Sequence, residues 1–486
     1  MKVLEEAHNL RNKKINKIEK MKSEQNPMDF IKSFAEFCKG KYEETVTDSH
    51  TKHFLKCLGL YDKGTSDTFV IRIRIPGGQL TAKQALKLSE CSKKYGNDYI
   101  DITTRGQVEF RYLKFKELPE LLKDLAHVGI SAIQCAGDNF RGVVTSPLDG
   151  YSKTSAIETM PLLQEIQSVF RNQEAWMGTL PRKFNIAILG DTINTCNIFG
   201  NDCAFALASK DGEFGFNLYL GGKVGVQARP LNLFVKPSEV KEVFASVISL
   251  YKEYGFRDNR NKNRLNFLLD AVTLDEFAKG IKEFSKLPLE EAGELLVKEE
   301  FTLDDTSTIE LKNNKSAIHF GIPSGIFCGK DLEEAALLAQ NYNGLLRLTF
   351  EQSFYIITDT SNIIDIKTSY LKLCDLTGGK IVKFSEEVLR KTPYSPFALR
   401  NCNEDDIDMS NYQEAGQSLP FQEALQLKKD KAKYNPSEDV TFTVNAVHPN
   451  TSIRYKYLGK TLSEVPLSST SRTWTPPSDD FKGYMV

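Results

Sequence analysis

The residues best suited to chemistry in this sequence are cations placed where predicted strands end or where glycines allow a turn. Arg105 follows the segment DITT, Arg141 lies within GDNFRGVV, and Arg182 and Lys183 lie within LPRKFNI. Guanidinium groups in such places suit the oxygens of carboxylates and other anions. Taken singly, each cation is more often a solvated surface charge. Their shared settings favour a common bound anion.

Two other pairs of residues could help to hold that anion. Lys183 and Asn185 are two apart on a predicted strand, so both face the same side and could reach one ligand. Gly221 and Gly222, in the segment GGKVG, could let the backbone approach a ligand closely. An ordinary turn explains a Gly-Gly pair equally well.

The segment FRDNRNKNRLNFLL is another basic stretch of the chain. It places Arg257, Arg260 and Arg264 three and four residues apart, a spacing that predicts a basic stripe along one helix. Such a stripe is usually solvated, but it could also neutralise a ligand that carries many carboxylates.

The nine cysteines form no recognisable metal or disulfide pattern. No two of them have C-x2-C or C-x3-C spacing, and the six histidines do not cluster beside them, which argues against a zinc site. An odd number of cysteines in a long chain without an export signal predicts reduced thiols. The cysteines are Cys38, Cys57, Cys91, Cys135, Cys196, Cys203, Cys328, Cys374 and Cys402.

Composition and charge set the class of protein. The chain has 486 residues, of which 41% are hydrophobic and 26% are charged, and its formal net charge is -1. This balance gives no long-range attraction to nucleic acid or to an anionic membrane. The polar N-terminus resembles no secretory signal, and no window approaches the roughly 18 apolar residues that span a bilayer. We therefore expect a cytoplasmic protein with no nucleic-acid or membrane partner.

The elements that must position the first cations follow a regular order. The segment TFVIRIRIPGG predicts a strand, LTAKQALKLSECSKKYG a helix with Thr81 as its N-cap, DYIDITTRGQVEFRYL one strand, and ELPELLKDLAHVG a second helix. This order predicts a ferredoxin-like split βαβ unit. Residues 316–357 repeat the order strand, Pro-Gly corner, helix and strand of residues 69–112, which indicates an internal duplication.

These patterns predict six regions. They are a helical arm (1–65), a first ferredoxin-like half-domain (66–148), an α/β domain (149–285), a linker (286–314), a second ferredoxin-like half-domain (315–385) and a divergent C-terminal region with an extended tail (386–486).

Seven motifs in this order resemble those of the siroheme-dependent nitrite and sulfite reductases, closest to the ferredoxin-type nitrite reductases. The resemblance covers roughly residues 15–360. The motifs are IRIRIPGG, DITTR, AGDNFRGVVTSPLDG, LPRKFNI, DGEFGFNLYLGG, GFRDNRNKNRLNFLLD and LRLTFEQ. The resemblance implies an α+β protein with two ferredoxin-like units related by a pseudo-two-fold axis. A siroheme and iron-sulfur type α/β domain accompanies them, with its second copy incomplete or remodelled.

The resemblance also implies roles for the cations. The family reduces a small oxyanion by six electrons at siroheme, so Arg105, Arg141, Lys183 and Asn185 become candidate catalytic residues. Sulfite reductases usually carry a lysine where this chain has Asn185, and one cation fewer suits singly charged nitrite. Candidate siroheme-binding residues are Arg105, Arg141, Arg182, Lys183, Gly221, Gly222 and Arg264.

The sequence departs from the family in its cysteines. In the family, C-x5-C and C-x3-C follow the RLTxEQ strand and hold a [4Fe-4S] cluster, but this chain has only Cys374 and Cys402 after residue 360. A cubane cluster ordinarily needs four thiolates, so the usual site cannot be built there. Distant cysteines could converge, the chain could have lost its electron-entry centre, or a second chain could supply the missing part.

Two functions remain open at this point. One is a nitrite or sulfite reductase with an external electron carrier such as ferredoxin, because no G-x-G-x-x-G or P-loop pattern supports a nucleotide cofactor. The alternative is a non-catalytic paralogue that acts as a tetrapyrrole-binding or reductase-partner scaffold. The intact cations favour the first, and the absent thiolates favour the second.

Overall fold

The computed structural model divides the chain into two units. The first comprises Met1–Asp304 and Thr308–Ile381, and the second comprises Asp305–Ser307 and Val382–Val486. The structure describes residues 1–62, 68–298, 308–322 and 325–366, together with six strand backbones between residues 427 and 485.

The first ferredoxin-like sheet has the strand order β1-β2-β5-β4-β14. Helix α6 (Ala82–Tyr95) begins at Thr81, whose side chain accepts a hydrogen bond from the Gln84 amide in a capping box, so the predicted N-cap is confirmed. Helix α7 (Leu118–Ala126) follows β5. The strands are β1 (Leu60–Asp62), β2 (Phe69–Ile73), β4 (Ile100–Ile102), β5 (Val108–Leu113) and β14 (Ile326–Phe327).

The segment from Asp98 to Leu113 is two strands and not the single strand that the sequence predicts. Strands β4 and β5 pair antiparallel with Ile102 opposite Val108. The turn between them closes when the Thr103 amide donates to the Gln107 carbonyl at 2.8 Å, and Gly106 adopts a φ of +57° there. Arg105 therefore stands at the tip of a hairpin.

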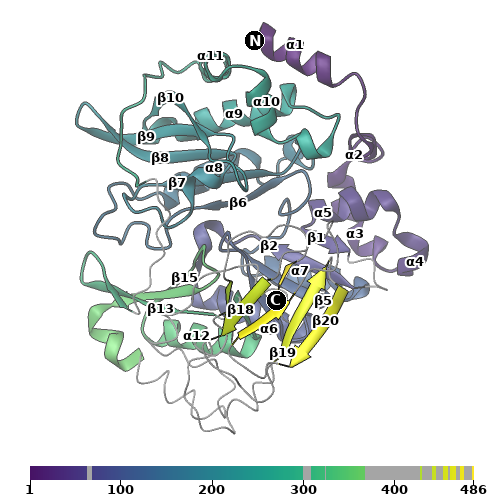
Figure 1. Cartoon of the computed structure of the whole chain (residues 1–486), viewed down its shortest axis with the longest axis vertical. Helices are drawn as coiled ribbons and strands as arrows, with labels where there is room; N and C mark the ends of the chain where they lie inside the picture. Colours follow the sequence, from purple (N-terminus) through teal and green to yellow (C-terminus); the bar gives the residue numbers. More distant parts are fainter. Residues whose placement is uncertain are drawn as a thin grey trace. The chain divides into compact units, whose positions relative to one another are not determined.

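The second ferredoxin-like sheet exchanges a short strand with the first. After the corner η2 (Pro76–Gly78), β3 (Gln79–Leu80) pairs with β15, and β14 of the second half pairs in turn with β4. Helices α6 and α12 (Gly329–Asn341) pack against each other. This reciprocal arrangement is the pseudo-two-fold pairing expected from the duplicated sequence (Figure 1). The other strands are β12 (Thr308–Glu310), β13 (Lys315–Phe320), β15 (Leu345–Leu348) and β16 (Phe354–Asp359).

The α/β domain is built on a mixed sheet of order β10-β9-β8-β7-β6. Strands β6, β7 and β8 are parallel, and β8, β9 and β10 are antiparallel. Strand β11 (Glu294–Leu295), within the predicted linker 286–314, also pairs with β8. The remaining strands are β6 (Phe140–Val144), β7 (Phe184–Leu189), β8 (Cys203–Lys210), β9 (Glu213–Leu220) and β10 (Arg229–Val235).

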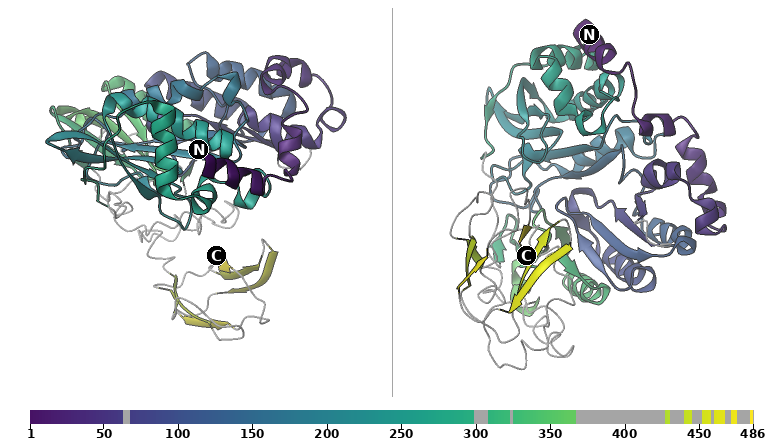
Figure 2. Two further views of the ribbon diagram at one scale, coloured as in Figure 1. Left: turned by 90° about the horizontal axis from the view of Figure 1, so that it is seen from above. Right: turned by 45° about the vertical axis from the view of Figure 1, so that its right-hand side comes forward.

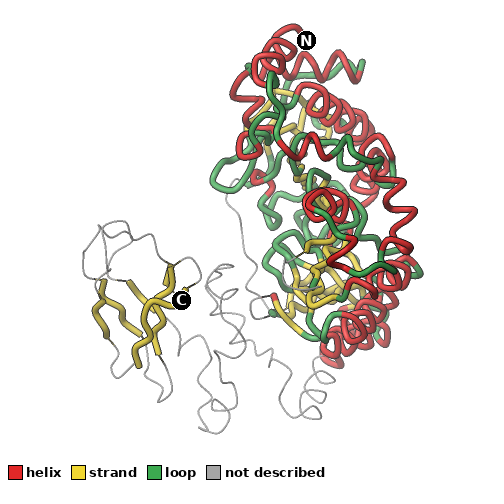
Figure 3. Tube along the Cα trace, turned by 90° about the vertical axis from the view of Figure 1, so that its right-hand side faces the viewer, coloured by secondary structure: helices red, strands yellow, loops and turns green. Residues whose placement is uncertain are grey.

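Alternation along β8 explains how this sheet is buried on both faces. Cys203 and Phe205 join the core beneath the helices, whereas Ala204 and Ala206 join a second cluster on the opposite face. The helices on the first face are α8 (Met160–Phe170), α9 (Val240–Tyr254), α10 (Leu265–Ala271) and α11 (Leu274–Ser285). Helices gather along one side of the first unit (Figure 3).

The N-terminal arm connects the α/β domain with the first ferredoxin-like sheet. Drawn in purple, it runs along the edge of the first unit in two views (Figure 1, Figure 2). Within the described part of the chain, no helix combines the length and apolar character needed to cross a membrane. The helices of the arm are α1 (Lys2–Arg11), α2 (Lys17–Met21), α3 (Pro27–Phe37), α4 (Tyr42–Thr45), the π-helix η1 (His50–Phe54) and α5 (Leu55–Cys57).

The described part of the second unit consists of two three-stranded sheets, of order β17-β18-β21 and β20-β19-β22. The rest of the predicted C-terminal region 386–486, including most of its predicted tail, lies outside the described residues. The strands are β17 (Leu427–Lys429), β18 (Val440–Val444), β19 (Ser452–Tyr457), β20 (Lys460–Pro466), β21 (Ser471–Trp474) and β22 (Tyr484–Met485).

Candidate functional site

Arg105 reaches from its hairpin turn into the edge of the α/β domain. Its Nη2 donates to the carbonyls of Gly142 and Ile186, each at 2.8 Å, and its Nη1 donates to Asn201 Oδ1 at 2.7 Å. Its Nε is buried and has no hydrogen-bond partner. Burial lowers the pKa of Arg105 to about 9 although the charge of Asp202 opposes this shift, so the group stays charged at neutral pH. None of its hydrogen bonds goes to a described carboxylate.

Arg141 lies on β6 and is also buried. Its Nη atoms donate to the carbonyls of Gly137 at 3.2 Å and Asn139 at 3.4 Å, and to no described carboxylate. Burial lowers the pKa of Arg141 to about 10. The charge of Arg141 also lowers the pKa of Arg105, so the two guanidinium groups lie near each other.

Lys183 and Asn185 lie at the start of β7, two residues apart as the sequence predicts. Burial, together with charge repulsion from Arg141, Arg264 and Arg182, lowers the pKa of Lys183 to about 8. The Asn185 side-chain oxygen is buried without a hydrogen-bond partner. These two residues thus add one cation and one polar group to the same place.

Arg264 differs from these cations because it is already paired. It contacts Asp202 through Nη2 at 2.5 Å and Nε at 3.1 Å, and its Nη2 also donates to the Gly222 carbonyl at 3.2 Å. The Asp202 carboxylate accepts a third hydrogen bond from the backbone N–H of Asn185 at 2.8 Å. Asp202 therefore holds two groups in place, the start of β7 and the side chain of Arg264.

The predicted basic stripe on one helix is wrong. The segment contains the short 3-10 helix η7 (Arg260–Lys262), and Arg264 precedes α10 as its N-cap residue. Arg257 pairs with Glu19, and Arg260 pairs with Asp138, so each arginine faces a different carboxylate. The Asn and Asp residues in this segment favour turns, which interrupts the helical period.

Gly221 and Gly222 are required by packing. A Cβ atom on Gly222 would lie 2.3 Å from the Phe199 carbonyl oxygen, and one on Gly221 would lie 2.9 Å from a Leu269 methyl group. Gly221 also has a φ of +85°, which disfavours other residues. These contacts explain the glycines without a ligand, and the predicted cofactor role stays a prediction.

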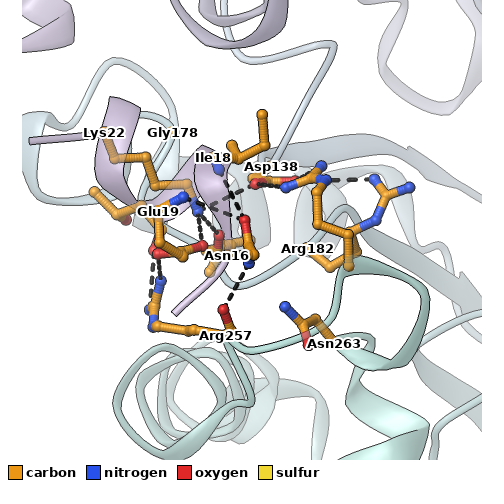
Figure 4. Close-up of polar contacts among 12 residues, drawn as sticks. Asn16, Ile18, Glu19, Lys22, Asp138, Gly178, Arg182, Arg257 and Asn263 are labelled. Atoms are coloured by element: carbon orange, nitrogen blue, oxygen red, sulfur yellow. Dashed lines mark hydrogen bonds and ion pairs between the residues drawn. The ribbon is translucent and has the colours of Figure 1, made fainter. Parts of the chain in front are cut away.

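Arg182 lies at the edge of a network centred on Asp138 (Figure 4). Its Nη1 is 3.8 Å from Asp138 Oδ1, while Arg260 donates to both Asp138 oxygens at 2.7 Å. Burial opposes ionisation of Asp138, but Lys22 and Arg260 overcome it and hold the pKa of Asp138 well below its ordinary value. Arg182 therefore lies farther from Asp138 than Arg260 does.

The structure therefore brings the predicted cations together. Arg105, Arg141 and Lys183 form what we call the cationic cluster. The described hydrogen bonds of its two arginines go to backbone carbonyls and to Asn201 Oδ1, while Asp202 acts on Arg105 and Lys183 only through its charge. Sequence reasoning missed Asp138, although it lies within the motif AGDNFRGVVTSPLDG, and it missed Asp202, which lies in none of the motifs.

The cationic cluster fits siroheme, which carries many carboxylates. Arg105 Nε and Asn185 Oδ1 are buried polar atoms without hydrogen-bond partners. Burial lowers the pKa of each of the three cations, and a bound anion would counter that effect. A bound polycarboxylate would offset the burial of these charges.

The described cysteines do not provide a cluster site. Among the residues that the structure describes, no three His, Cys, Asp or Glu side chains converge in a way that could hold a metal ion. Burial raises the pKa of Cys57, Cys91, Cys196 and Cys328 to about 12, which disfavours thiolates. Cys374 and Cys402 lie outside the described residues.

Family models match the two regions that carry these cations, the first ferredoxin-like region and the α/β domain. Residues 61–128 match the nitrite/sulfite reductase ferredoxin-like half domain, and residues 136–288 match the nitrite and sulphite reductase 4Fe-4S domain. Residues 429–486 match glycosyl hydrolase family 66, which concerns only the second unit.

Individual relatives agree with these matches. The ferredoxin–nitrite reductases of Synechococcus elongatus and Leptolyngbya laminosa are 33% and 30% identical, and each alignment covers 70% of this chain and 68% of the relative. The chloroplastic ferredoxin–nitrite reductase of Arabidopsis thaliana is 32% identical over 71% of this chain and 62% of its own length. The structure of Mycobacterium tuberculosis NirA has the same fold, with a TM-score of 0.71, 20% identity and coverage of 94% of this chain and 91% of that chain.

Proposed function

The chain belongs to the siroheme-dependent nitrite and sulfite reductase family, and we propose that it reduces nitrite at a siroheme held by the cationic cluster. The observation that carries this proposal is that Arg141 is buried with Arg105 and Lys183 half-buried near it, and none of the three forms an ion pair or hydrogen bond with a described carboxylate. Such an arrangement is costly to a protein that binds no anion, because buried charges are ordinarily paired. An anionic cofactor and an anionic substrate would supply the missing charge.

The residues would divide two tasks. Siroheme, when bound, supplies an iron centre that binds the oxyanion and passes six electrons to it. Arg105 and Arg141, which are fixed by backbone carbonyls, would hold carboxylates of the cofactor. Lys183, whose pKa is lowered to about 8, would attract the anion and could donate a proton to a departing oxygen near neutral pH.

Asn185 supports nitrite as the substrate. Its side-chain oxygen is buried, and Asn185 lies on β7 two residues after Lys183, so a lysine at this position would place a second ammonium near the first. Sulfite carries up to two negative charges and nitrite carries one, so a site with one ammonium suits nitrite.

Electrons would come from an external carrier. The curated relatives are named ferredoxin–nitrite reductases, and a ferredoxin-type donor is the corresponding proposal for this chain. The chain spans 68% of the cyanobacterial relatives and 62% of the Arabidopsis relative. The described residues offer no cluster site, so we propose that a second chain completes the path of electrons to the site.

A charge substitution tests the substrate assignment. The siroheme-loaded protein, supplied with reduced ferredoxin without air, should convert nitrite to ammonium, and Asn185→Lys should shift the ratio of kcat/KM values toward sulfite by about ten-fold. The control Asn185→Gln keeps an amide and should leave that ratio within about two-fold.

Two results would contradict the proposal. If siroheme-loaded protein reduced neither anion with any donor, a tetrapyrrole-binding scaffold would be the better description. If Asn185→Gln shifted the ratio as much as Asn185→Lys, charge at this position would not decide the substrate.

A further inference from the structure

We propose that Lys22, on the N-terminal arm, is a positioning residue for the cationic cluster and acts through Asp138 and the Leu180 carbonyl. The inference rests on the proposed function only where it concerns siroheme. It gives the arm, which the sequence suggests is a peripheral cap, a part in building the site.

The ammonium of Lys22 is held by three partners. It lies 3.1 Å from Asp138 Oδ2, donates to the Leu180 carbonyl at 2.6 Å and contacts Glu19 Oε1 at 2.5 Å. Its side chain is 11% exposed, and that of Asp138 is 1% exposed. Buried charges held in this way keep a defined geometry, because any displacement leaves a charge without a partner.

Two of these partners lie on the segments that carry the cations. Asp138 is three residues before Arg141, and Leu180 is three residues before Lys183. The same two segments are also joined by Asn139, whose side-chain oxygen accepts from the Gly178 amide at 2.7 Å. Lys22 therefore links the approach to β6 with the approach to β7.

A third basic segment enters the same network (Figure 4). Glu19, one turn before Lys22, accepts from Arg257 Nη1 at 2.6 Å, while Arg257 Nη2 donates to the Thr179 carbonyl at 3.1 Å. Arg260 holds both oxygens of Asp138. The end of α2 is thus the point where three segments with cations meet.

Lys22 does not belong to the cluster itself. Its ammonium forms its hydrogen bonds and ion pairs with Glu19, Asp138 and Leu180, and with none of the three cluster cations. Its positioning effect on a bound anion passes through the segments that it holds, and the Asp138→Asn variant described below separates this effect from that of charge.

The test compares Lys22→Met with Lys20→Met in the full-length protein. Both substitutions remove one ammonium from the same part of the arm, but Lys20 is exposed and forms no ion pair among the described residues. In protein without siroheme, amide hydrogen exchange of residues 137–142 and 179–184 should rise at least about ten-fold in Lys22→Met and stay unchanged in Lys20→Met. The Kd for siroheme, from titration of the visible spectrum, should rise about ten-fold in Lys22→Met alone.

The variant Asp138→Asn separates positioning from charge. Removal of a negative charge beside a cationic cluster should tighten the binding of an anion if charge alone matters. Positioning predicts the opposite, a weaker binding of siroheme by about ten-fold, because Arg260 and Lys22 lose their shared partner. If a single variant does not fold, the double variant Lys22→Met with Asp138→Asn removes both charges together and should show the same rise in hydrogen exchange.

The outcomes are distinct. Equal exchange and equal siroheme affinity in Lys22→Met and Lys20→Met would overturn the inference, as would tighter siroheme binding by Asp138→Asn. If the unsubstituted protein bound no siroheme, the proposed function would fail, while the exchange measurement would still decide whether Lys22 positions the two segments.

Discussion

At the scale of single residues, the unusual feature is a lysine whose charge is disfavoured by its surroundings. Lys183 is largely buried and faces Arg141, Arg182 and Arg264, which together with burial lower its pKa to about 8. A lysine side chain in water has a pKa near 10.4, so it keeps its proton until the pH approaches that value. Lys183 therefore loses its charge at a lower pH than Arg105, whose pKa is about 9, and Arg141, whose pKa is about 10.

This shift predicts a pH dependence of anion binding. Lys183 is protonated below its pKa and neutral above it, so nitrite affinity of the siroheme-loaded protein should be full at pH 7 and fall by about ten-fold as the pH rises through 8 toward 9.5. A bound anion favours the charged form, so the midpoint in the complex should lie above 8. Visible titrations with nitrite at each pH would measure this.

The control is Lys183→Arg, which keeps its charge throughout this range. Its nitrite affinity should depend on pH less than that of the unsubstituted protein. An unchanged pH profile in Lys183→Arg would assign the titration to another group.

At the scale of elements, the site depends on pairings between segments that are far apart in the sequence. Asp202, which begins the approach to β8, holds both Arg264 and the start of β7. The cations could be predicted from their motifs, because residue type and glycine-rich context mark them locally. The carboxylates and Lys22 could not, because their partners lie many tens of residues away and only the folded chain brings them together.

Removal of the Asp202 charge should destabilise the first unit. Asp202→Asn leaves Arg264 buried without its carboxylate, and the free energy of unfolding in urea should fall by about 3 kcal/mol. The control Asp211→Asn changes an exposed residue in the turn between β8 and β9 and should cost less than about 0.5 kcal/mol. Equal effects of the two substitutions would show that the Asp202 pair contributes little.

The exchanged strands give a second test at this scale. Gly78 has a φ of +71°, and a Cβ atom there would lie 2.3 Å from the Leu348 carbonyl oxygen on β15. Gly78→Ala should therefore lower the free energy of unfolding by more than about 3 kcal/mol. Gly212→Ala, with a φ of +83° and open space around it, should cost about 1 kcal/mol. Similar losses in both variants would mean that the contact with β15 is not rigid.

At the scale of the whole molecule, the duplicated order of elements predicts the paired ferredoxin-like halves, because periodicity and Pro-Gly corners are local signals. The exchange of β3 and β14 could not be predicted, since each strand has only two residues and pairs with the other half. The hairpin at Arg105 was missed because the apolar alternation continues on both sides of its turn. The predicted domain boundaries remain predictions.

Whether the cationic cluster holds siroheme is best decided by the visible absorption spectrum of full-length protein purified without air from cells that overproduce siroheme. We expect siroheme bands at about one tetrapyrrole per chain, and a loss of most of that absorption in the folded variant Arg141→Met, with acid-labile sulfide reporting any cluster separately. A folded, colourless unsubstituted protein, or equal siroheme content in Arg141→Met, would contradict this expectation.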